Sequence, residues 1–331
     1  LFPYTTLFRS FTRFLEKRGF SVTPCCNGKE AWDEYQKSPY NLVLLDWNMP
    51  QMTGAELCER IKQNQNDSYT YVILITSRSD AEDIIQGLES GADDYITKPV
   101  VAAELNARLT SALRVLDFEE KLKNKEKEVR LNCYKTLTQL AETRDHESEG
   151  HMTRVGEFCA MIARKMGLDE SFCQDLSVFA PMHDIGKVGI PDGILHVPRE
   201  LCSEEFQVIK MHTQIGWQIL KDKKVFELAS EIAYTHHEHW DGNGYPRHLK
   251  GEAIPLAGRI CAVADCYDSL RSVRSYRSKA SHSQVMNWIK LSSGTVFDPK
   301  VVDAAVAIEN DLKELFDKTY TIDVEETPNR I

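Results

Sequence analysis

Helix-like and strand-like patterns alternate in the first third of the chain, and this alternation limits the folds that it can adopt. Between Phe11 and Leu116, amphipathic segments such as GAELCERIKQ are separated by short apolar runs such as NLVLLDW, YVILITS and DYITKPV. Such alternation is typical of a parallel sheet packed between helices, with functional residues at the carboxyl ends of its strands. We therefore predict an α/β domain over residues 11–116.

Three of these apolar runs end in a polar residue. Asp46 closes LVLLD, Thr76 closes VILIT, and Lys98 precedes Pro99 after DYIT. A carboxylate that ends an apolar strand usually solvates or caps a loop, and a lone Lys-Pro pair has little meaning. The combination is more specific, because a bound phosphoryl group needs a cation, a hydroxyl donor and a divalent metal around it.

This combination resembles the receiver domain of bacterial response regulators, and the resemblance covers nearly all of residues 11–116. It implies a flavodoxin-like fold in which Asp46 accepts a phosphoryl group, Thr76 hydrogen-bonds it, and Lys98 pairs with its charge. Tyr95 is the aromatic residue that changes rotamer. The resemblance also implies a sensor histidine kinase as partner, and Mg²⁺ held by an acidic pair at the end of a first strand.

The residues before Phe11 do not supply that acidic pair. The opening decapeptide, LFPYTTLFRS, instead resembles the translation of a common sequencing adapter. We therefore treat residues 1–10 as a scar outside the fold, with a divergent first strand as the alternative. The prediction is an incomplete receiver domain that lacks its first strand and binds Mg²⁺ and phosphate poorly.

A stretch of helix-forming residues follows the α/β domain. Residues 117–140 contain no Gly or Pro, and opposite charges recur three to four residues apart. We predict a helical linker here. Its apolar stripe either packs on its own domain or forms a homodimer with a second copy, and we expect the homodimer. The stripe consists of Leu116, Leu122, Val129, Leu137 and Leu140.

The second half, residues 141–320, reads mostly as helices and contains many imidazole and carboxylate side chains. A single His on an apolar helix is more often a hydrogen-bonded core residue than a ligand. A set of eight is different, because burying so many ionisable groups is costly unless each has a partner. We therefore predict a metal site. Its candidate ligands are Glu147, His151, His183, Asp184, His212, His236, His237 and Asp265.

The ligand types narrow the metal and the reaction. Mixed imidazole and carboxylate ligands favour Fe, Mn or Zn over Mg, and the lack of thiolate argues against structural zinc. A carboxylate such as Asp184 can bridge two ions about 3.5 to 4 Å apart, which activates water for attack on a phosphate ester. If HDIGK is helical, His183 and Lys187 lie one turn apart, and Gly186 leaves room for substrate.

Three motifs, HDIGKVGIPDGIL, HHEHWDGNGYP and RICAVADCYDSL, together resemble the HD-GYP family of cyclic di-GMP phosphodiesterases, a subset of the HD phosphohydrolases. The resemblance runs from AETRDHESEGHMTRV to GTVFDPKVV and implies an all-α domain. It implies a third metal at Glu147 with His151, with iron as the metal and manganese as a substitute. The two-metal core that it implies consists of His183, Asp184, His212, His236, His237 and Asp265.

The same resemblance assigns further roles. Lys187 contacts the scissile phosphate or assists the leaving group, while Asp184 holds the metals that carry the attacking hydroxide. The loop residues Gly244, Tyr245 and Pro246 face the ligand, although DGNGYP alone would be a tight surface turn.

Two arginines, Arg274 and Arg277, contact the ligand phosphates in the same resemblance, and guanidinium forks suit that task. Ordinary solvated arginines are the alternative for both. Ser275 stands where proline is usual, and Arg271 where a small hydroxyl residue is usual. These departures bear on substrate affinity and leave the metal ligands untouched.

Composition limits the partners and the compartment. A net charge of −10 argues against a nucleic-acid polymer as the main partner. No apolar run approaches the roughly 18 residues of a membrane span, so we expect no membrane partner. Scattered cysteines without a CxxC pair fit reduced thiols. We therefore expect a cytoplasmic protein.

The predicted function is that of a response regulator that hydrolyses cyclic di-GMP to pGpG, and on to GMP, under control of phosphorylation at Asp46. Two alternatives stay open: a catalytically weak cyclic di-GMP sensor or interaction module, and a phosphohydrolase for another cyclic dinucleotide or nucleotide. Residues 321–331 read as a tail.

Overall fold

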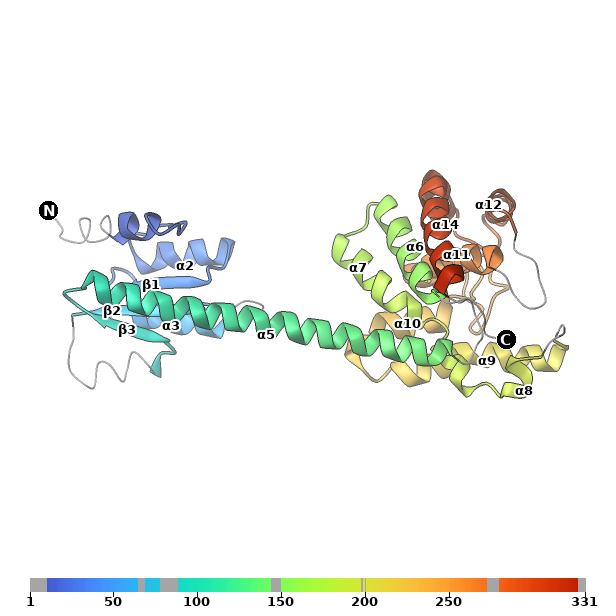
Figure 1. Cartoon of the computed structure of the whole chain (residues 1–331), viewed down its shortest axis with the longest axis horizontal. Coiled ribbons are helices and arrows are strands. Elements are labelled where there is room, and N and C mark those ends of the chain that lie inside the picture. Colours follow the sequence, from blue (N-terminus) through green and yellow to red (C-terminus); the bar gives the residue numbers. More distant parts are fainter. Residues whose placement is uncertain are drawn as a thin grey trace. The chain divides into compact units, whose positions relative to one another are not determined.

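The computed structural model describes residues 11–64, 69–77, 89–143, 150–197, 199, 201–272 and 280–326. Its elements form two compact units, Leu1–Glu128 and Val129–Ile331. Helix α5 (Ala102–Glu142) begins in the first unit and ends in the second (Figure 1). The helical linker expected over residues 117–140 lies within this longer helix.

A parallel sheet forms the centre of the first unit. Val43 pairs with Val72 and Ile75 with Ile96, so the described strands lie in the order β1-β2-β3. These strands are β1 (Leu42–Asp46), β2 (Tyr71–Thr76) and β3 (Asp94–Thr97). The helices around them are α2 (Gly28–Lys37), α3 (Gly54–Gln63) and the first part of α5. This arrangement confirms the predicted α/β architecture.

Strand β2 contributes to an apolar core on each face of the sheet. Its residues are buried throughout, as expected of a parallel strand covered on both sides. Successive side chains of a strand point to opposite faces. Val72 therefore packs with Leu57 of α3, while Ile73 packs with Leu105 and Leu109 of α5.

Local sequence sets where several helices begin. Before α3, the Thr53 hydroxyl accepts a hydrogen bond from the Glu56 amide at 3.2 Å, and the Glu56 carboxylate accepts one from the Thr53 amide at 2.9 Å. This reciprocal capping box satisfies two amides that the helix leaves unpaired. Before α2, Asn27 accepts from the Glu30 amide in the same way.

The described part of the second unit is mostly helical, which confirms the predicted all-α architecture (Figure 1). None of the described helices combines the length and hydropathy needed to cross a membrane. The α-helices are α6 (His151–Lys165), α7 (Glu170–Phe179), α8 (Asp192–Leu195), α9 (Ser203–Leu220), α10 (Glu227–Thr235), α11 (Leu256–Arg271), α12 (His282–Leu291), α13 (Pro299–Ala307) and α14 (Glu309–Glu326).

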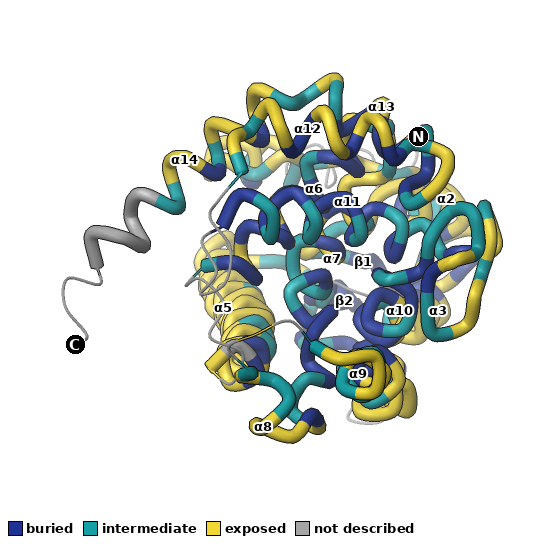
Figure 2. Tube along the Cα trace, turned by 90° about the vertical axis from the view of Figure 1, so that its right-hand side faces the viewer, coloured by how far each residue is buried: buried dark blue, intermediate teal, exposed yellow. Residues whose placement is uncertain are grey.

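Helices α6 and α11 carry much of the core of this unit, and buried residues recur along both (Figure 2). Phe158 of α6 meets Tyr267 of α11 edge to face, with ring centroids 5.2 Å apart. Such aromatic pairs contribute beyond the area that they bury. Because α6 begins at His151 and α11 contains Asp265, this packing also positions two of the predicted ligands.

Candidate metal centre

Five segments that lie far apart in the sequence bring the predicted ligands together. They are the turn between the 3-10 helices η1 (Ala180–Met182) and η2 (Ile185–Gly189), helix α9, the end of α10, the start of α6, and α11. The turn carries His183 and Asp184, and α9 carries His212. His236 and His237 follow α10, while α6 carries His151 and α11 carries Asp265.

The HDIGK segment is not one continuous helix, contrary to our expectation. Asp184 has φ −100° and ψ 9°, and it separates η1 from η2. Gly186 lies so close to α9 that a Cβ there would be 1.9 Å from the His212 carbonyl oxygen. The space beside Gly186 is therefore filled by α9, and the expectation that it leaves room for substrate was wrong.

One group of ligand atoms, which we call the Asp184 group, consists of Asp184, His212, His236 and His237. The Nε2 atoms of His212 and His236 lie 3.1 and 3.6 Å from Asp184 Oδ1. The two Nε2 atoms lie 3.3 Å from each other. Three nitrogen or oxygen ligand atoms thus converge on one small volume.

A second group, which we call the His151 group, consists of His151, His183 and Asp265. Asp265 Oδ1 lies 3.6 Å from His151 Nε2 and 3.8 Å from His183 Nε2. His183 Nε2 also lies 3.2 Å from Asp184 Oδ2. Asp184 therefore presents one carboxylate oxygen to each group, as a bridging ligand does.

Hydrogen bonds at the other ring nitrogen orient these histidines. The Nδ1 atoms of His183, His212 and His236 donate to the carbonyl oxygens of Ala180, Ile209 and Ile232, at 2.8, 2.7 and 3.1 Å. In a neutral imidazole the Nε2 atom then carries a lone pair. The lone pairs of His212 and His236 face each other and Asp184, and a cation between them would relieve this repulsion.

The protonation of the cluster suits metal binding. Burial raises the pKa of Asp184, but Lys187, His183 and His212 together hold that pKa well below its usual range. Burial lowers the pKa of both His236 and His237. An anionic carboxylate and neutral imidazoles are the forms that ligate metals.

Buried polar atoms without a hydrogen-bond partner among the described residues also indicate a metal site. Burial lowers the pKa of His183, yet the adjacent Asp184 raises it overall, so this ring favours a proton that a bound metal ion would displace. His183 Nε2 and Asp184 Oδ1 are buried without a hydrogen-bond partner among the described residues. Buried polar groups seldom lack a partner. The residues present therefore fit divalent metal ions.

Lys187 lies at the same centre. Its Nζ atom is 2.8 Å from Asp184 Oδ2, and its side chain is 12% exposed. The ammonium group is thus close to both ligand groups while keeping some access from outside.

The loop predicted to bind substrate, Gly244 to Pro246, lies against the Asp184 group. The Tyr245 ring stacks on His237, with centroids 4.8 Å apart and planes 26° apart. A Cβ at Gly244 would be 2.1 Å from the His239 amide nitrogen, so only glycine allows this close turn. Pro246 follows Tyr245 through a cis peptide bond. The structure therefore brings this loop to the metal centre.

Sequence reasoning missed Glu238, which holds this loop. Glu238 is 3% exposed, and its carboxylate accepts hydrogen bonds from the amides of Arg247 at 2.7 Å and Leu249 at 2.9 Å. Its position directly after the predicted ligands His236 and His237 was the feature of the sequence that could have indicated its role. A carboxylate that binds two backbone amides fixes the course of the loop.

Three predicted site residues lie outside the described residues. They are Glu147, which was assigned to a third metal, and the phosphate-binding candidates Arg274 and Arg277. The unusual Arg271 is described: it pairs with Asp317 of α14 at 2.7 Å and donates to the Tyr267 hydroxyl at 2.9 Å. Arg271 therefore ties α11 to α14.

In the first unit the strand ends meet as predicted. Lys98 Nζ lies 2.5 Å from Asp46 Oδ2, and Asp46 is buried at the end of β1. Thr76 ends β2, and its carbonyl oxygen accepts from the Lys98 amide at 2.7 Å. Tyr95 is half-buried in β3. A carboxylate and a cation thus meet at the carboxyl ends of the strands, and Thr76 ends the strand between β1 and β3.

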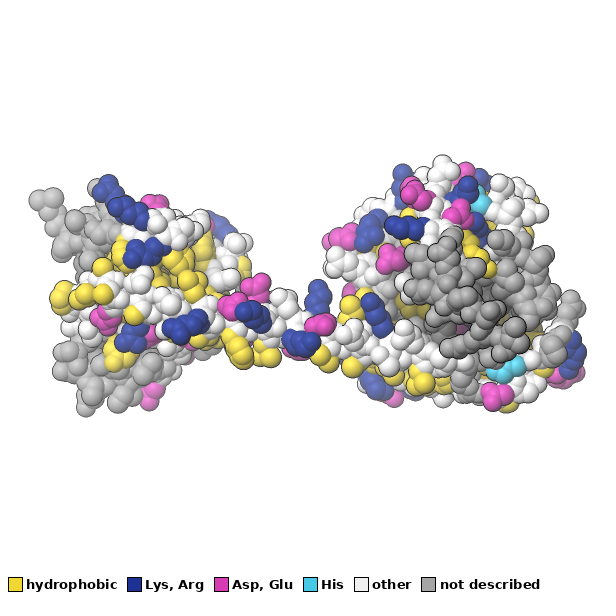
Figure 3. Space-filling model, in the orientation of Figure 1, with side chains coloured by type: hydrophobic (Ala, Val, Ile, Leu, Met, Phe, Trp, Pro, Cys, Tyr) yellow, Lys and Arg dark blue, Asp and Glu magenta, His cyan; other side chains and the backbone are white. Residues whose placement is uncertain are grey.

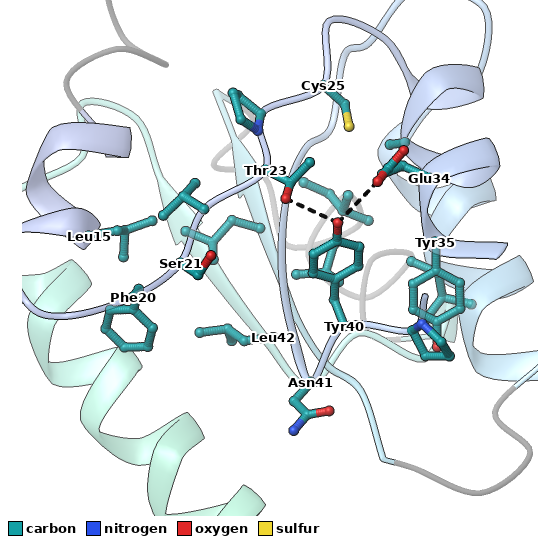
Figure 4. Close-up of a pocket in the computed structure, with 18 of the residues that line it drawn as sticks. Leu15, Phe20, Ser21, Thr23, Cys25, Glu34, Tyr35, Tyr40, Asn41 and Leu42 are labelled. Atoms are coloured by element: carbon teal, nitrogen blue, oxygen red, sulfur yellow. Dashed lines mark hydrogen bonds between the residues drawn. The ribbon is translucent and has the colours of Figure 1, made fainter. Parts of the chain in front are cut away.

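A cavity of about 990 Å³ runs along β1 on the side away from β2. Leu15 and Phe20 line one wall, and Leu42 lines another (Figure 4). The Tyr40 hydroxyl donates to Thr23 Oγ1 at 3.0 Å at this cavity. Among the described strands β1 is an edge, and its residues line the cavity along their whole length.

Family models match both units. The response regulator receiver domain matches residues 5–110, and the HD domain matches residues 135–301. These matches accord with the α/β unit and with the helical unit that carries the metal centre.

Three relatives illustrate the similarity. A cyclic di-GMP phosphodiesterase of Thermotoga maritima is 36% identical over 327 residues, covering 92% of this chain and 88% of the relative. The cyclic di-GMP phosphodiesterase response regulator RpfG of Xanthomonas campestris pv. campestris is 34% identical, covering 83% and 77%. The 3'3'-cGAMP-specific phosphodiesterase 2 of Vibrio cholerae is 40% identical, covering 50% and 32%.

Proposed function

The chain belongs to the response regulators that carry an HD domain, and on that basis we propose that it hydrolyses cyclic di-GMP to pGpG, and further to GMP, in a metal-dependent reaction. The names of two relatives support the substrate. The observation that carries the reaction type is the bridging position of Asp184, whose oxygens face both ligand groups. Paired metal sites of this kind suit phosphodiester hydrolysis.

In this proposal some residues of the centre bind metal and one, Lys187, contacts the substrate. Bound metal ions would supply Lewis acidity and an activated water. Asp184, Asp265 and the histidines would hold those ions with carboxylate oxygens and imidazole nitrogens. The Lys187 ammonium, 2.8 Å from Asp184, would contact a phosphoryl oxygen or give a proton to the leaving oxygen.

Iron is the metal that we propose, with manganese as a substitute. Mixed imidazole and carboxylate ligands suit both ions. Two ions would be held by His183, Asp184, His212, His236, His237 and Asp265, and Glu147 with His151 would hold a third.

The substrate would lie against the loop of Gly244, Tyr245 and Pro246, with Arg274 and Arg277 on its phosphates. The stacking of Tyr245 on His237 supports this proposal, because it places the tyrosine ring directly beside a ligand of the centre. One guanidinium group can donate two parallel hydrogen bonds to a phosphate, which suits the role of both arginines.

The receiver unit would regulate the reaction. A sensor histidine kinase would phosphorylate Asp46, with Mg²⁺ bound weakly in this chain, and the cytoplasm is the expected compartment. The Lys98–Asp46 ion pair supports this, because an added phosphoryl group would draw the ammonium from the carboxylate. Equal turnover with and without a phosphoryl donor would contradict this regulation.

The α5 helix would form a homodimer. Apolar side chains of α5 remain exposed, and they lie on the surface of this helix in Figure 3. Phe118 is 65% exposed, Leu122 54% and Leu140 66%. Exposed Cys133 lies between them, so mild oxidation should cross-link two copies through it. A Cys133→Ser variant is the control, and failure to cross-link would contradict a parallel dimer.

A second substrate class is favoured by one comparison. The relative from Vibrio cholerae is named a 3'3'-cGAMP-specific phosphodiesterase, at 40% identity over 169 residues. In the proposed role Lys187 would contact phosphate and not base, and that role suits either dinucleotide. A parallel assay with both dinucleotides separates the two.

The decisive experiment is hydrolysis of cyclic di-GMP by protein purified without oxygen and loaded with Fe(II) or Mn(II). We expect turnover to pGpG by the natural sequence and none by the variants His183→Ala and Asp184→Ala, because each removes a ligand. The matched control is His196→Ala, an exposed histidine outside both ligand groups, which should keep full activity.

Two outcomes would contradict the proposal. Binding of cyclic di-GMP without turnover by metal-loaded protein would favour the sensor alternative. Turnover of another nucleotide alone would move the proposal to that substrate.

A further inference from the structure

One ligand of the centre is oriented differently from the others. His183, His212 and His236 each donate their Nδ1 proton to a backbone carbonyl oxygen. His151 Nδ1 instead lies 2.6 Å from Asp268 Oδ2, a carboxylate oxygen. Because a carboxylate accepts and does not donate, it keeps the proton on Nδ1 and leaves the Nε2 lone pair for metal.

Asp268 is itself held rigidly in a dry environment. It is fully buried, and its Oδ1 accepts from Arg154 Nε at 2.6 Å while its Oδ2 accepts from Arg154 Nη2 at 3.1 Å. Ser272 Oγ lies 3.3 Å from Oδ2. Arg154 is 1% exposed. A buried carboxylate is costly unless its geometry and partners are good, and this two-pronged pairing meets that condition.

The spacing of these residues along their helices explains the arrangement. Arg154 follows His151 by three residues on α6, and Asp268 follows Asp265 by three on α11. Residues three apart share a helix face. Helix α6 thus presents the ligand His151 and the arginine that fixes Asp268, while α11 presents the carboxylate that supports His151.

Helix α14 completes the surroundings of Arg154. The Arg154 guanidinium lies over the Phe316 ring at 5.2 Å and over the Tyr320 ring at 5.8 Å. The Arg271 guanidinium also lies over the Phe316 ring, at 4.1 Å, and pairs with Asp317. The unusual Arg271 therefore helps to keep α14 in the position that encloses Arg154.

We propose that Asp268, fixed by Arg154, is a positioning residue that orients His151 and strengthens it as a ligand, and so sets the metal affinity of the His151 group. The proposal rests on the metal-dependent function given above. An anionic hydrogen-bond partner makes an imidazole a stronger donor than a carbonyl partner does. The Asp184 group has no contact of this kind among the described residues, so the two groups should respond differently to a change at Asp268.

The test uses the full chain with Asp268→Asn, which preserves the shape of the side chain and removes its charge. Mn(II) binding is titrated without substrate, and bound metal is counted after dialysis against a chelator. We expect one class of sites, the His151 group, to lose affinity by about 10- to 100-fold while the other class stays unchanged. Equal Mn(II) affinity and content in the variant and the natural sequence would overturn the proposal.

Two further variants separate positioning from a loss of stability. In a His151→Ala background, Asp268→Asn should cause no additional loss of Mn(II) affinity, because it acts through His151. An equal additional loss would overturn the proposal. Met286→Ala, a buried residue of α12 outside this network, serves as a control that lowers stability without lowering metal affinity.

The metal titration and the hydrolysis assay fail independently. If the protein binds Mn(II) in two classes of sites but hydrolyses no cyclic dinucleotide, the proposed function falls and the role of Asp268 stands. If hydrolysis occurs and Asp268→Asn leaves Mn(II) binding unchanged, the function stands and the positioning role falls.

Discussion

Replacing Gly186 by alanine should disrupt the metal centre through packing alone. The added Cβ would lie 1.9 Å from the His212 carbonyl oxygen and 2.4 Å from the Gly216 amide nitrogen. Both are backbone atoms, so no side-chain rotation relieves the contact. Ordinary contact begins at 3.4 Å, so η2 and α9 must separate by about 1.5 Å.

The magnitude follows from that separation. Overpacking of a well-packed interior costs typically about 1–3 kcal/mol, and we expect the upper end here because backbone must move. Moving α9 also moves His212, which lies 3.1 Å from Asp184. A misplacement of about 1 Å lowers catalysis by about 100-fold, so turnover should fall at least that far.

The assay combines urea denaturation with Mn(II) titration and turnover. The matched control is Gly193→Ala in α8, where a Cβ meets no atom within 4 Å. That change should leave activity intact and should not destabilise, because alanine is the better helix former. The reasoning is refuted if Gly186→Ala keeps the Mn(II) affinity and stability of the natural sequence.

Four further predictions concern single groups. Lys187→Ala should lower kcat by about 10²–10³-fold with bound metal unchanged, because it removes a cation that meets developing charge; parallel loss of metal by elemental analysis would contradict this. Removing metal with a chelator should lower the thermal midpoint, since metal at about 100 times its Kd stabilises by about 2.7 kcal/mol; identical midpoints would argue against a resident metal. Glu238→Ala should destabilise by about 1.5–3 kcal/mol for each hydrogen bond between a loop amide and this carboxylate that is lost, and should raise KM, whereas Glu252→Ala on the surface should change neither. Asp46→Asn should abolish any change of turnover on adding a phosphoryl donor, and a persisting response would place the phosphorylation elsewhere.

Much of the architecture was readable from local pattern. Periodicity indicated the strands that end in Asp46 and Thr76, and the helical second unit, because buried strands and amphipathic helices leave their period in any short window. The ligands were readable from chemistry, since seven of the eight predicted side chains lie in the two groups. The eighth, Glu147, lies outside the described residues.

Other features of the site were decided only by tertiary contact. Nothing within HDIGK shows that Gly186 faces α9, because the atoms that exclude a Cβ belong to residues at positions 212 and 216. The break of that segment into two 3-10 helices accompanies the same close packing.

Asp268 shows most clearly the difference between what the sequence determines and what tertiary contacts decide. By itself it is one more acidic residue on a helix, and only the packing of α6 on α11 brings it to Arg154 and His151, more than a hundred residues away. Side-chain type and spacing determined which groups could bind metal. The contacts between distant segments decided which nitrogen of each imidazole carries the proton and which carboxylate bridges, because those depend on partners that no local stretch of sequence contains.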